Sequence, residues 1–185
     1  MRVIAGSARG IPLETIEEMT TRPTVDRVKE NLFNVLMPYI DGAVVCDFFS
    51  GSGSLCIESL SRGASQAYLV EKNPKAMEVI KRNLKKTRLE DRAELFLGSY
   101  DYAIEHYKDR NISFDILFLD PPHKSNFAKD AMEKIKDLPI LKKDGIIVIE
   151  HHSNQVFEEI IGTFHLWKRK KYGNTSLSFY LKEQE

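Results

Sequence analysis

An Asp-Pro-Pro-His sequence follows an apolar run, and its residue types suit the binding of an amino group. The run is Phe114–Leu119, and Asp120, Pro121, Pro122 and His123 come directly after it. Two consecutive prolines fix two φ angles and remove two N–H donors. The turn therefore offers acceptors, namely carbonyl oxygens and the Asp120 carboxylate, to a partner that only donates, such as an exocyclic amino group. The His123 ring could then lie flat on a nucleic-acid base. A rigid strand terminator is the alternative interpretation.

A glycine turn after the first apolar run is a second candidate site. The run contains Asp47, and Gly51 and Gly53 lie four and six positions later. Glycines let the backbone turn sharply and approach a ligand closely. A dinucleotide fingerprint needs Gly or Ala three positions after the second glycine, where this chain has Cys56. The turn therefore favours a nucleoside-type ligand without phosphates, unless it serves backbone geometry alone.

An acidic residue ends the second apolar run. Glu71 lies eighteen positions after Gly53, and an acid at the end of the second strand of such a unit can accept hydrogen bonds from ribose hydroxyls. A solvated strand end is the alternative. Asp47, inside an apolar run, is costly to bury unless it is hydrogen-bonded or faces an ammonium group.

Five short apolar runs, separated by stretches of helical period, must position these residues. The runs are Val44–Phe49, Ala67–Glu71, Ala93–Leu97, Phe114–Leu119 and Ile146–Glu150. Runs that are apolar on both faces are typical of strands buried between helical layers. Their alternation with helices predicts a doubly wound, mostly parallel α/β sheet.

The two ends of the chain add further elements. Runs at Phe164–Lys170 and Ser176–Leu181, joined by a short turn, predict a C-terminal antiparallel hairpin and bring the sheet to seven strands. Short strands around a Gly6–Gly10 turn predict a small N-terminal β-hairpin. A helix from Thr24 to about Met37 follows, and Pro38 is expected to stop it. We expect a single domain, with an extension over 1–40 and a catalytic core over 41–185.

Composition narrows the function classes. The 185 residues carry 27 basic and 27 acidic side chains, which excludes a uniformly basic coat but allows a local basic stripe. No apolar run approaches the ~20 residues of a membrane span, and no signal-peptide segment is expected. Cys46 and Cys56 cannot form a disulfide framework, which favours a cytoplasmic protein. His151 and His152 are adjacent and would point apart on a strand, so we expect no metal site.

The densest basic run is Lys168-Arg169-Lys170-Lys171. Alternate residues of a strand point to opposite faces, so about half of the run could meet one phosphate track. Lys168 and Lys170 are the candidates, together with Arg22 and Arg27 near the N-terminus. Protection of an edge strand by lysines is the alternative.

Several of these stretches resemble a known family. Asp-Pro-Pro-aromatic after the fourth strand resembles the signature of S-adenosylmethionine-dependent amino methyltransferases that act on nucleic-acid bases. Nearly the whole chain is similar to the RsmD family, in stretches that lie in order along the sequence: residues 22–30, Asp47–Gly53, Ser61–Ala64, Asp120–Pro122 and Tyr172–Thr175. The family usually has Phe or Tyr where His123 stands.

The resemblance implies the class I methyltransferase fold, S-adenosyl-L-methionine as cofactor and no metal. It implies methylation of the N2 amino group of a guanine in 16S rRNA, guanine 966 in the family's rRNA numbering, within an assembled or assembling small ribosomal subunit. Catalysis is expected from Asp120, Pro121, Pro122 and His123. The cofactor is expected at eight residues: Asp47, Phe49, Gly51, Gly53, Glu71, Lys72, Ser99 and Asp120.

Two alternatives stay open. One is an Asp-Pro-Pro methyltransferase that acts on adenine or cytosine in DNA or RNA, although we see no added target-recognition domain. The other is a non-catalytic RNA-binding module on the same fold. Asp120 and the glycine pair argue against the second, because a binding module needs neither.

Overall fold

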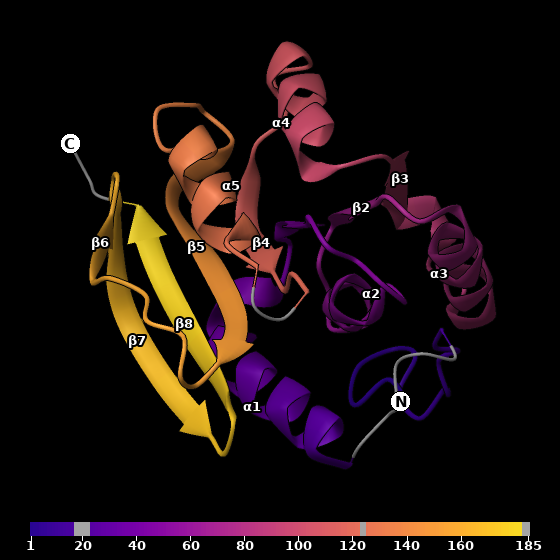
Figure 1. Ribbon diagram of the computed structural model, residues 1–185. Helices are drawn as coiled ribbons and strands as arrows, with labels where there is room; N and C mark the ends of the chain where they lie inside the picture. Colours follow the sequence, from indigo (N-terminus) through magenta and orange to yellow (C-terminus); the bar gives the residue numbers. More distant parts are fainter. Residues whose placement is uncertain (17–22, 123–124, 183–185) are drawn as a thin grey trace.

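The computed structural model describes residues 1–16, 23–122 and 125–182, and a single sheet runs through it (Figure 1). The strand order is β3-β2-β1-β4-β5-β8-β7-β6, with the first five strands parallel and the last three antiparallel. The strands are β1 Val44–Asp47, β2 Gln66–Glu71, β3 Ala93–Leu97, β4 Phe114–Leu119, β5 Leu141–His152, β6 Ile160–Ile161, β7 Phe164–Tyr172 and β8 Thr175–Lys182. The doubly wound sheet with its terminal hairpin is confirmed. The described sheet has eight strands instead of seven, because the two-residue β6 pairs with the start of β7.

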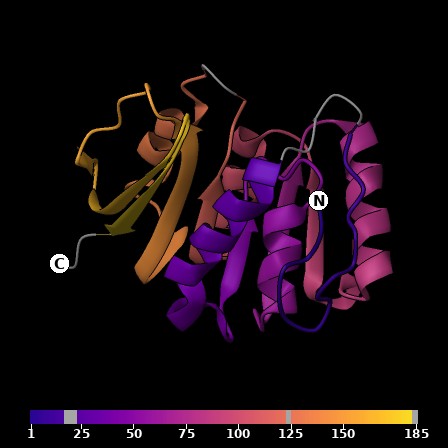
Figure 2. The same ribbon diagram turned by 90° about the horizontal axis from the view of Figure 1, so that it is seen from below.

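The helices cover both faces of the sheet. They are α1 Pro23–Ile40, α2 Ser54–Ser61, α3 Pro74–Thr87, α4 Tyr100–Asp109 and α5 Phe127–Ile135, with a short 3₁₀ turn at Glu90–Arg92. Helices α1, α2 and α3 lie on one face, and α4 and α5 lie on the other (Figures 1 and 2). Two apolar clusters fill the two interfaces. Each described helix is too short or too polar to cross a bilayer.

Helix α1 is longer than predicted, because it continues through Pro38 to Ile40. A proline so close to the end of a helix costs few of its hydrogen bonds. Ile40 is 2% exposed and anchors the last turn in the core. Since α1 ends just before β1, its first turn lies at the carboxyl edge of the parallel strands.

The N-terminal segment forms the predicted antiparallel hairpin in a very short version, in which Arg2 bridges Pro12. Val3 N–H donates to the Ile11 carbonyl at 3.0 Å, and Leu13 N–H donates to the Met1 carbonyl at 2.9 Å. The next backbone donors bind a side chain of α2: Ile4 N–H and Ala5 N–H donate to the Glu58 carboxylate at 2.9 and 3.2 Å. The segment therefore pairs with itself and also docks on α2. The periodicity of a sequence does not indicate that a side chain such as Glu58 will accept these backbone hydrogen bonds.

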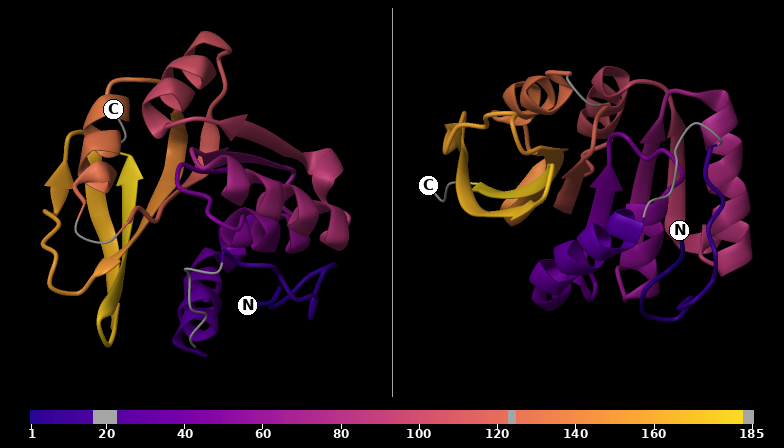
Figure 3. Two further views of the ribbon diagram at one scale, coloured as in Figure 1. Left: turned by 45° about the vertical axis from the view of Figure 1, so that its right-hand side comes forward. Right: turned by 60° about the horizontal axis from the view of Figure 1, so that its bottom comes forward.

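The hairpin of β7 and β8 reaches the carboxyl edge of the sheet. Its two-residue turn has Gly173 at φ +60°, which favours glycine. Thr175 of β8 pairs with His152, the last residue of β5. Figure 3 shows that the tip of the hairpin and the start of α1 reach the same end of the molecule.

Candidate active site

Four carboxylates lie at the carboxyl ends of four neighbouring strands. Asp47 ends β1, Glu71 ends β2, Asp120 follows β4, and Glu150 lies near the end of β5. The order β2-β1-β4-β5 brings these ends side by side at one edge of the sheet. This is the edge at which open α/β sheets bind ligands.

The glycine turn is held by two of these carboxylates. Asp47 Oδ1 accepts from Phe49 N–H at 2.9 Å, and Glu71 Oε2 accepts from Gly51 N–H at 2.8 Å. Gly51 and Gly53 have φ of +56° and +83°, in the left-handed region that favours glycine. A Cβ on Gly53 would come within 3.2 Å of a Leu69 methyl group, so α2 could not approach β2 as closely. The turn thus connects the ends of β1 and β2 through the Glu71 side chain.

The carboxylates also make this edge strongly acidic. Burial raises the pKa of Asp47 to about 7, and the charges of Glu71 and Glu150 contribute. The pKa of Asp120 is raised well above its ordinary value by burial and by the charges of Glu150 and Asp47. Burial also raises the pKa of Glu150. Within the described ranges no Lys or Arg forms an ion pair with any of the four. The edge therefore favours a cationic ligand or a bound proton.

Aromatic rings border the acidic edge on the side of α4 and α5. The Phe49 and Phe127 rings lie nearly parallel, with centroids 6.3 Å apart and planes at 11°, and Tyr100 contacts both rings. The Lys72 ammonium lies 6.0 Å from the Phe127 ring centroid. A planar ligand could be held here between the ends of β1 and β2 and the start of α5.

Most predicted cofactor residues come together at this edge. Ser99 begins α4 without capping it through its side chain, and the neighbouring Gly98 N–H donates to the Glu71 carbonyl at 3.0 Å. Ser99 therefore lies close to the end of β2, and its contact with the cofactor stays a prediction. Phe49 and Lys72 belong to the aromatic border described above.

The proline turn keeps one carbonyl occupied. The Pro122 carbonyl accepts from the Ser125 N–H at 3.3 Å and from its hydroxyl at 2.7 Å. Asp120 and the Pro121 carbonyl are then the acceptors of the turn that make no hydrogen bond to another described residue. His123 lies outside the described residues, so its position relative to the edge is a sequence prediction only.

The predicted RNA-binding residues fall in different places. Arg22 lies outside the described residues, and Arg27 is exposed near the start of α1. Lys168 and Lys170 lie on β7, on the face of the hairpin that looks toward α1, and not among the carboxylates. Lys29, which sequence analysis did not single out, is buried and donates to the Ser54 hydroxyl at 3.0 Å.

Sequence analysis also missed Glu150, Tyr100 and Phe127. Glu150 carried a usable signal, because it ends an apolar run as Glu71 does. Tyr100 and Phe127 carried none, because an aromatic residue at a helix start is equally typical of core packing. Among the described residues no group of three or more His, Cys, Asp or Glu side chains could hold a metal ion.

Comparison with known proteins places the chain in a family. The family model described as Conserved hypothetical protein 95 matches residues 1–181. YlbH of Bacillus subtilis is 37% identical over 98% of this chain and 99% of its own. The Ribosomal RNA small subunit methyltransferase D of Haemophilus influenzae is 35% identical over 81% of this chain and 78% of its own.

Solved structures share the fold. The yhhF structure from Escherichia coli superposes with a TM-score of 0.83 at 28% identity and covers 100% of this chain and 99% of that one. SMU.776, solved in complex with S-adenosylhomocysteine, has a TM-score of 0.68 at 13% identity, over 82% of this chain and 48% of that one. The fold is that of class I methyltransferases. The chain belongs to the Conserved hypothetical protein 95 family, the family of the RsmD-type small-subunit rRNA methyltransferases.

Proposed function

We propose that this protein uses S-adenosyl-L-methionine to methylate the N2 amino group of a guanine in 16S rRNA, guanine 966 in the family's rRNA numbering. Membership of a family of rRNA methyltransferases supports the reaction class. The single observation that carries the finer assignment is Asp120. This carboxylate lies at the end of β4, has no cationic partner among the described residues, and belongs to a turn that offers acceptors only.

The residues at the acidic edge fit the cofactor. S-Adenosylmethionine is a cation, and this edge holds four carboxylates without a matching charge from any described Lys or Arg. A carboxylate has about four lone-pair positions, and Glu71 uses two of them on Gly51 and Asn73. It therefore keeps capacity for ribose hydroxyls. The bound cofactor would supply an electrophilic methyl group on its sulfonium.

Asp120 and the Pro121 carbonyl would act on the target amine. The nitrogen lone pair of an aromatic amine is delocalised into the ring and becomes nucleophilic only as the amine turns pyramidal. Two acceptors that hold the two N–H groups favour that geometry and stabilise the positive charge that develops on nitrogen. The same acceptors fix the direction of the nitrogen, which supplies the orientation part of catalysis.

The RNA would be held by residues around this edge. His123 would stack on the guanine, which must leave its own stack to enter the site. Arg27 near the start of α1 and Lys168 and Lys170 on β7 would contact phosphates of 16S rRNA in an assembled or assembling small subunit, and from the sequence we propose the same role for Arg22. With such a substrate we expect the protein to work in the cytoplasm.

The test is mass spectrometry of nucleosides from small-subunit RNA incubated with the protein and labelled cofactor. We expect labelled N2-methylguanosine, located at one position by nuclease mapping. Label in methyladenosine or methylcytidine would assign the protein to the other Asp-Pro-Pro methyltransferases. RNA binding without any transfer would make it a binding module.

A further inference from the structure

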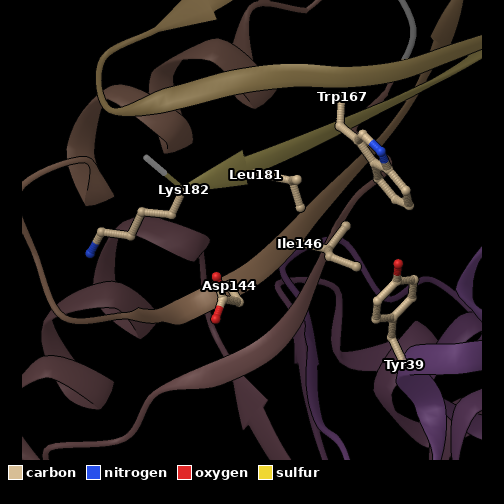
Figure 4. A pocket seen from close by; sticks show the side chains of 6 residues that line it. All are labelled: Tyr39, Asp144, Ile146, Trp167, Leu181 and Lys182. Carbon is tan, nitrogen blue, oxygen red and sulfur yellow. The ribbon is translucent and has the colours of Figure 1, made fainter. Parts of the chain in front are cut away.

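A groove between α1 and β7 contains the two lysines assigned above to RNA phosphates, together with aromatic residues that have no role in the methyl transfer. A hollow of about 300 Å³ lies there, and we call it the Trp167 groove, lined by Asn34, Pro38, Tyr39, Trp167, Lys168 and Lys170. A second hollow of about 290 Å³ adjoins it and shares Tyr39 and Trp167. Figure 4 shows these two rings next to Ile146 and Leu181 in the second hollow.

Trp167 is fixed as an exposed aromatic platform. It sits where the pairing of β7 with β8 shifts register, between Leu166 and Lys168. The indole meets Tyr39 edge-on, with centroids 5.9 Å apart, and meets Phe179 edge-on at 6.3 Å. It is nevertheless 38% exposed, and Tyr39 is 45% exposed. Proteins that bind single-stranded nucleic acids use aromatic rings of this kind to stack on the bases.

Two ammonium groups stand beside this platform. Lys168 and Lys170 point to the α1 side, and the Lys168 ammonium lies 4.9 Å from the indole ring centroid. Arg169 points to the other face, where it donates to the Phe157 carbonyl at 2.7 Å. Neither Lys168 nor Lys170 has an ion pair with an acidic residue of the described ranges. A nucleotide would bring a partner for each group, its base for the indole and its phosphate for the lysines.

Edge protection alone does not explain the groove. Lysines on an open edge prevent pairing with other strands, and β6 covers only the first two residues of β7. Two exposed aromatic rings beside the same lysines would promote association instead. Their presence favours a ligand that needs both kinds of group.

The groove leads to the active site. Lys170 pairs with Leu177 of β8, and Leu177 pairs with Glu150 of β5, so Lys170 lies level with the acidic edge. Trp167 lies about 10 Å further back along β7, at about 3.3 Å per residue. The far end of the second hollow holds both Asp144 and Lys182 and so presents both signs of charge, whereas the Trp167 groove presents two lysines. The favourable path therefore runs from Trp167 past Lys170 toward Asp120.

We infer that the Trp167 groove binds single-stranded RNA adjoining the target nucleotide, with one unpaired base against Trp167 and Tyr39 and phosphates at Lys168 and Lys170. The inference rests on the proposed rRNA function, because an enzyme that extrudes one base from RNA must hold the strand on either side of it.

The first test uses fluorescence, because Trp167 is the single tryptophan of the chain. A six-nucleotide single-stranded RNA of mixed sequence is titrated into the protein, and binding is followed in parallel by anisotropy of a labelled copy. We expect saturable quenching with the same dissociation constant in both measurements. Trp167→Ala should weaken binding about five- to 150-fold, as expected for one lost stack, while Trp167→Phe should retain most of it. RNA binding without quenching would overturn the inference.

The second test separates the two faces of β7. Lys168→Gln with Lys170→Gln should lower the slope of log affinity against log salt by about 0.7 for each lost contact, so by about 1.4. Lys171→Gln is the matched control, because Lys171 is exposed on the same strand but points to the opposite face. An equal decrease of this slope in the control and in the double variant would contradict the binding of phosphates in the Trp167 groove. If the quenching does not change with salt concentration, the occupant of the groove would be an apolar peptide and not RNA. If the quenching depends on protein concentration without RNA, the occupant would be a second copy of the chain.

Steady-state methyl transfer to small-subunit RNA distinguishes the two proposals. If both hold, Trp167→Ala raises KM for RNA and leaves kcat nearly unchanged. Transfer by Trp167→Ala with a wild-type KM would overturn the groove and leave the proposed function intact. RNA binding at the groove without transfer by the wild-type protein would overturn the proposed function alone.

Discussion

Two of the four carboxylates at the carboxyl edge accept hydrogen bonds from backbone N–H groups, while Asp120 and Glu150 accept none from the described residues, and this separates their tasks. Glu71 and Asp47 are bound to backbone N–H groups of the glycine turn, which suits residues that hold a cofactor. Asp120 belongs to a turn that offers acceptors only. The raised pKa of Asp47, Asp120 and Glu150 means that the free protein binds protons where the ligand is expected to bring positive charge.

We expect Asp120→Ala to lower methyl transfer about a hundred- to thousandfold, the usual cost of losing one preorganised group that stabilises transition-state charge. Cofactor affinity should stay within about tenfold, because Asp120 is assigned to the target amine. Calorimetric titration beside a transfer assay measures both. Asp115→Asn is the control, since Asp115 lies on the same strand and bonds Val44 N–H and Lys142 at its other end. Near-normal transfer by Asp120→Ala would exclude the mechanism.

Glu71→Ala should have the reverse effect. Loss of charged hydrogen bonds to the ribose, and of the contact to Gly51, should weaken the cofactor by about 1–3 kcal/mol, or five- to 150-fold. The transfer rate at saturating cofactor should change much less. Equilibrium dialysis with labelled cofactor gives the affinity, and an unchanged value would return Glu71 to the role of a solvated strand end.

Binding of the cofactor should release a proton near neutral pH. Asp47 has a pKa of about 7 in the free protein, and a bound cation favours its charged form and lowers that pKa. Affinity should therefore fall as the pH drops from about 7 to 5, by at most tenfold per unit. Calorimetry in buffers of different ionisation enthalpy counts the protons. Asp47→Asn should weaken this pH dependence, leaving the part that comes from Asp120 and Glu150, and a pH-independent wild-type affinity would refute the assignment.

At the scale of elements, the parallel core was predictable and its surroundings were less so. β4 has the predicted bounds because its apolar run is buried over nearly its whole length and ends where burial does. β3 also has the predicted bounds, although it is a partly exposed strand at the edge of the sheet. β5 extends to Leu141–His152, beyond the predicted Ile146–Glu150, because its ends pair with neighbours and carry polar side chains. The N-terminal hairpin is shorter than predicted, because the next backbone donors, at residues 4 and 5, bind a side chain of α2. The four carboxylates come together at one edge because of the order of the strands in the sheet, and the hydrophobic periodicity of a single sequence does not reveal that order.

The contact between the N-terminal segment and α2 gives a prediction of its own. Glu58 is fully buried and lies 2.9 Å from the Arg62 guanidinium and 3.8 Å from the Lys29 ammonium, besides accepting backbone N–H bonds from residues 4 and 5. Removing one member of a buried ionic group leaves uncompensated charge and costs about 3–5 kcal/mol. Glu58→Gln should lower the free energy of unfolding by about that amount in urea denaturation. Glu78→Gln, in an exposed pair with Lys81, should change it by less than about 1 kcal/mol; similar losses in the two variants would contradict this role of Glu58.

At the scale of the whole molecule, a formal charge of zero coexists with strong local charge. Carboxylates gather at the strand ends, and lysines line the α1 side of β7. This separation of charge suits a protein that binds a small cationic ligand at the strand ends and a polyanion along β7. The zero net charge of the chain does not reveal either charged region.

Packing across the whole molecule determines whether residues 1–40 form a dispensable extension. Leu32, Phe33, Leu36 and Ile40 of α1 are at most 2% exposed and belong to the apolar cluster on that face of the sheet. Burial of each side chain contributes about 1.5–3 kcal/mol, so the four together rival the roughly 5–15 kcal/mol that keeps a domain folded. We therefore expect residues 41–185 alone to show no cooperative thermal transition. In the full chain, far-ultraviolet circular dichroism and Trp167 fluorescence should report one coincident transition. A fragment 41–185 that melts cooperatively, or two separate transitions in the full chain, would show that the first forty residues form a unit apart from the catalytic core.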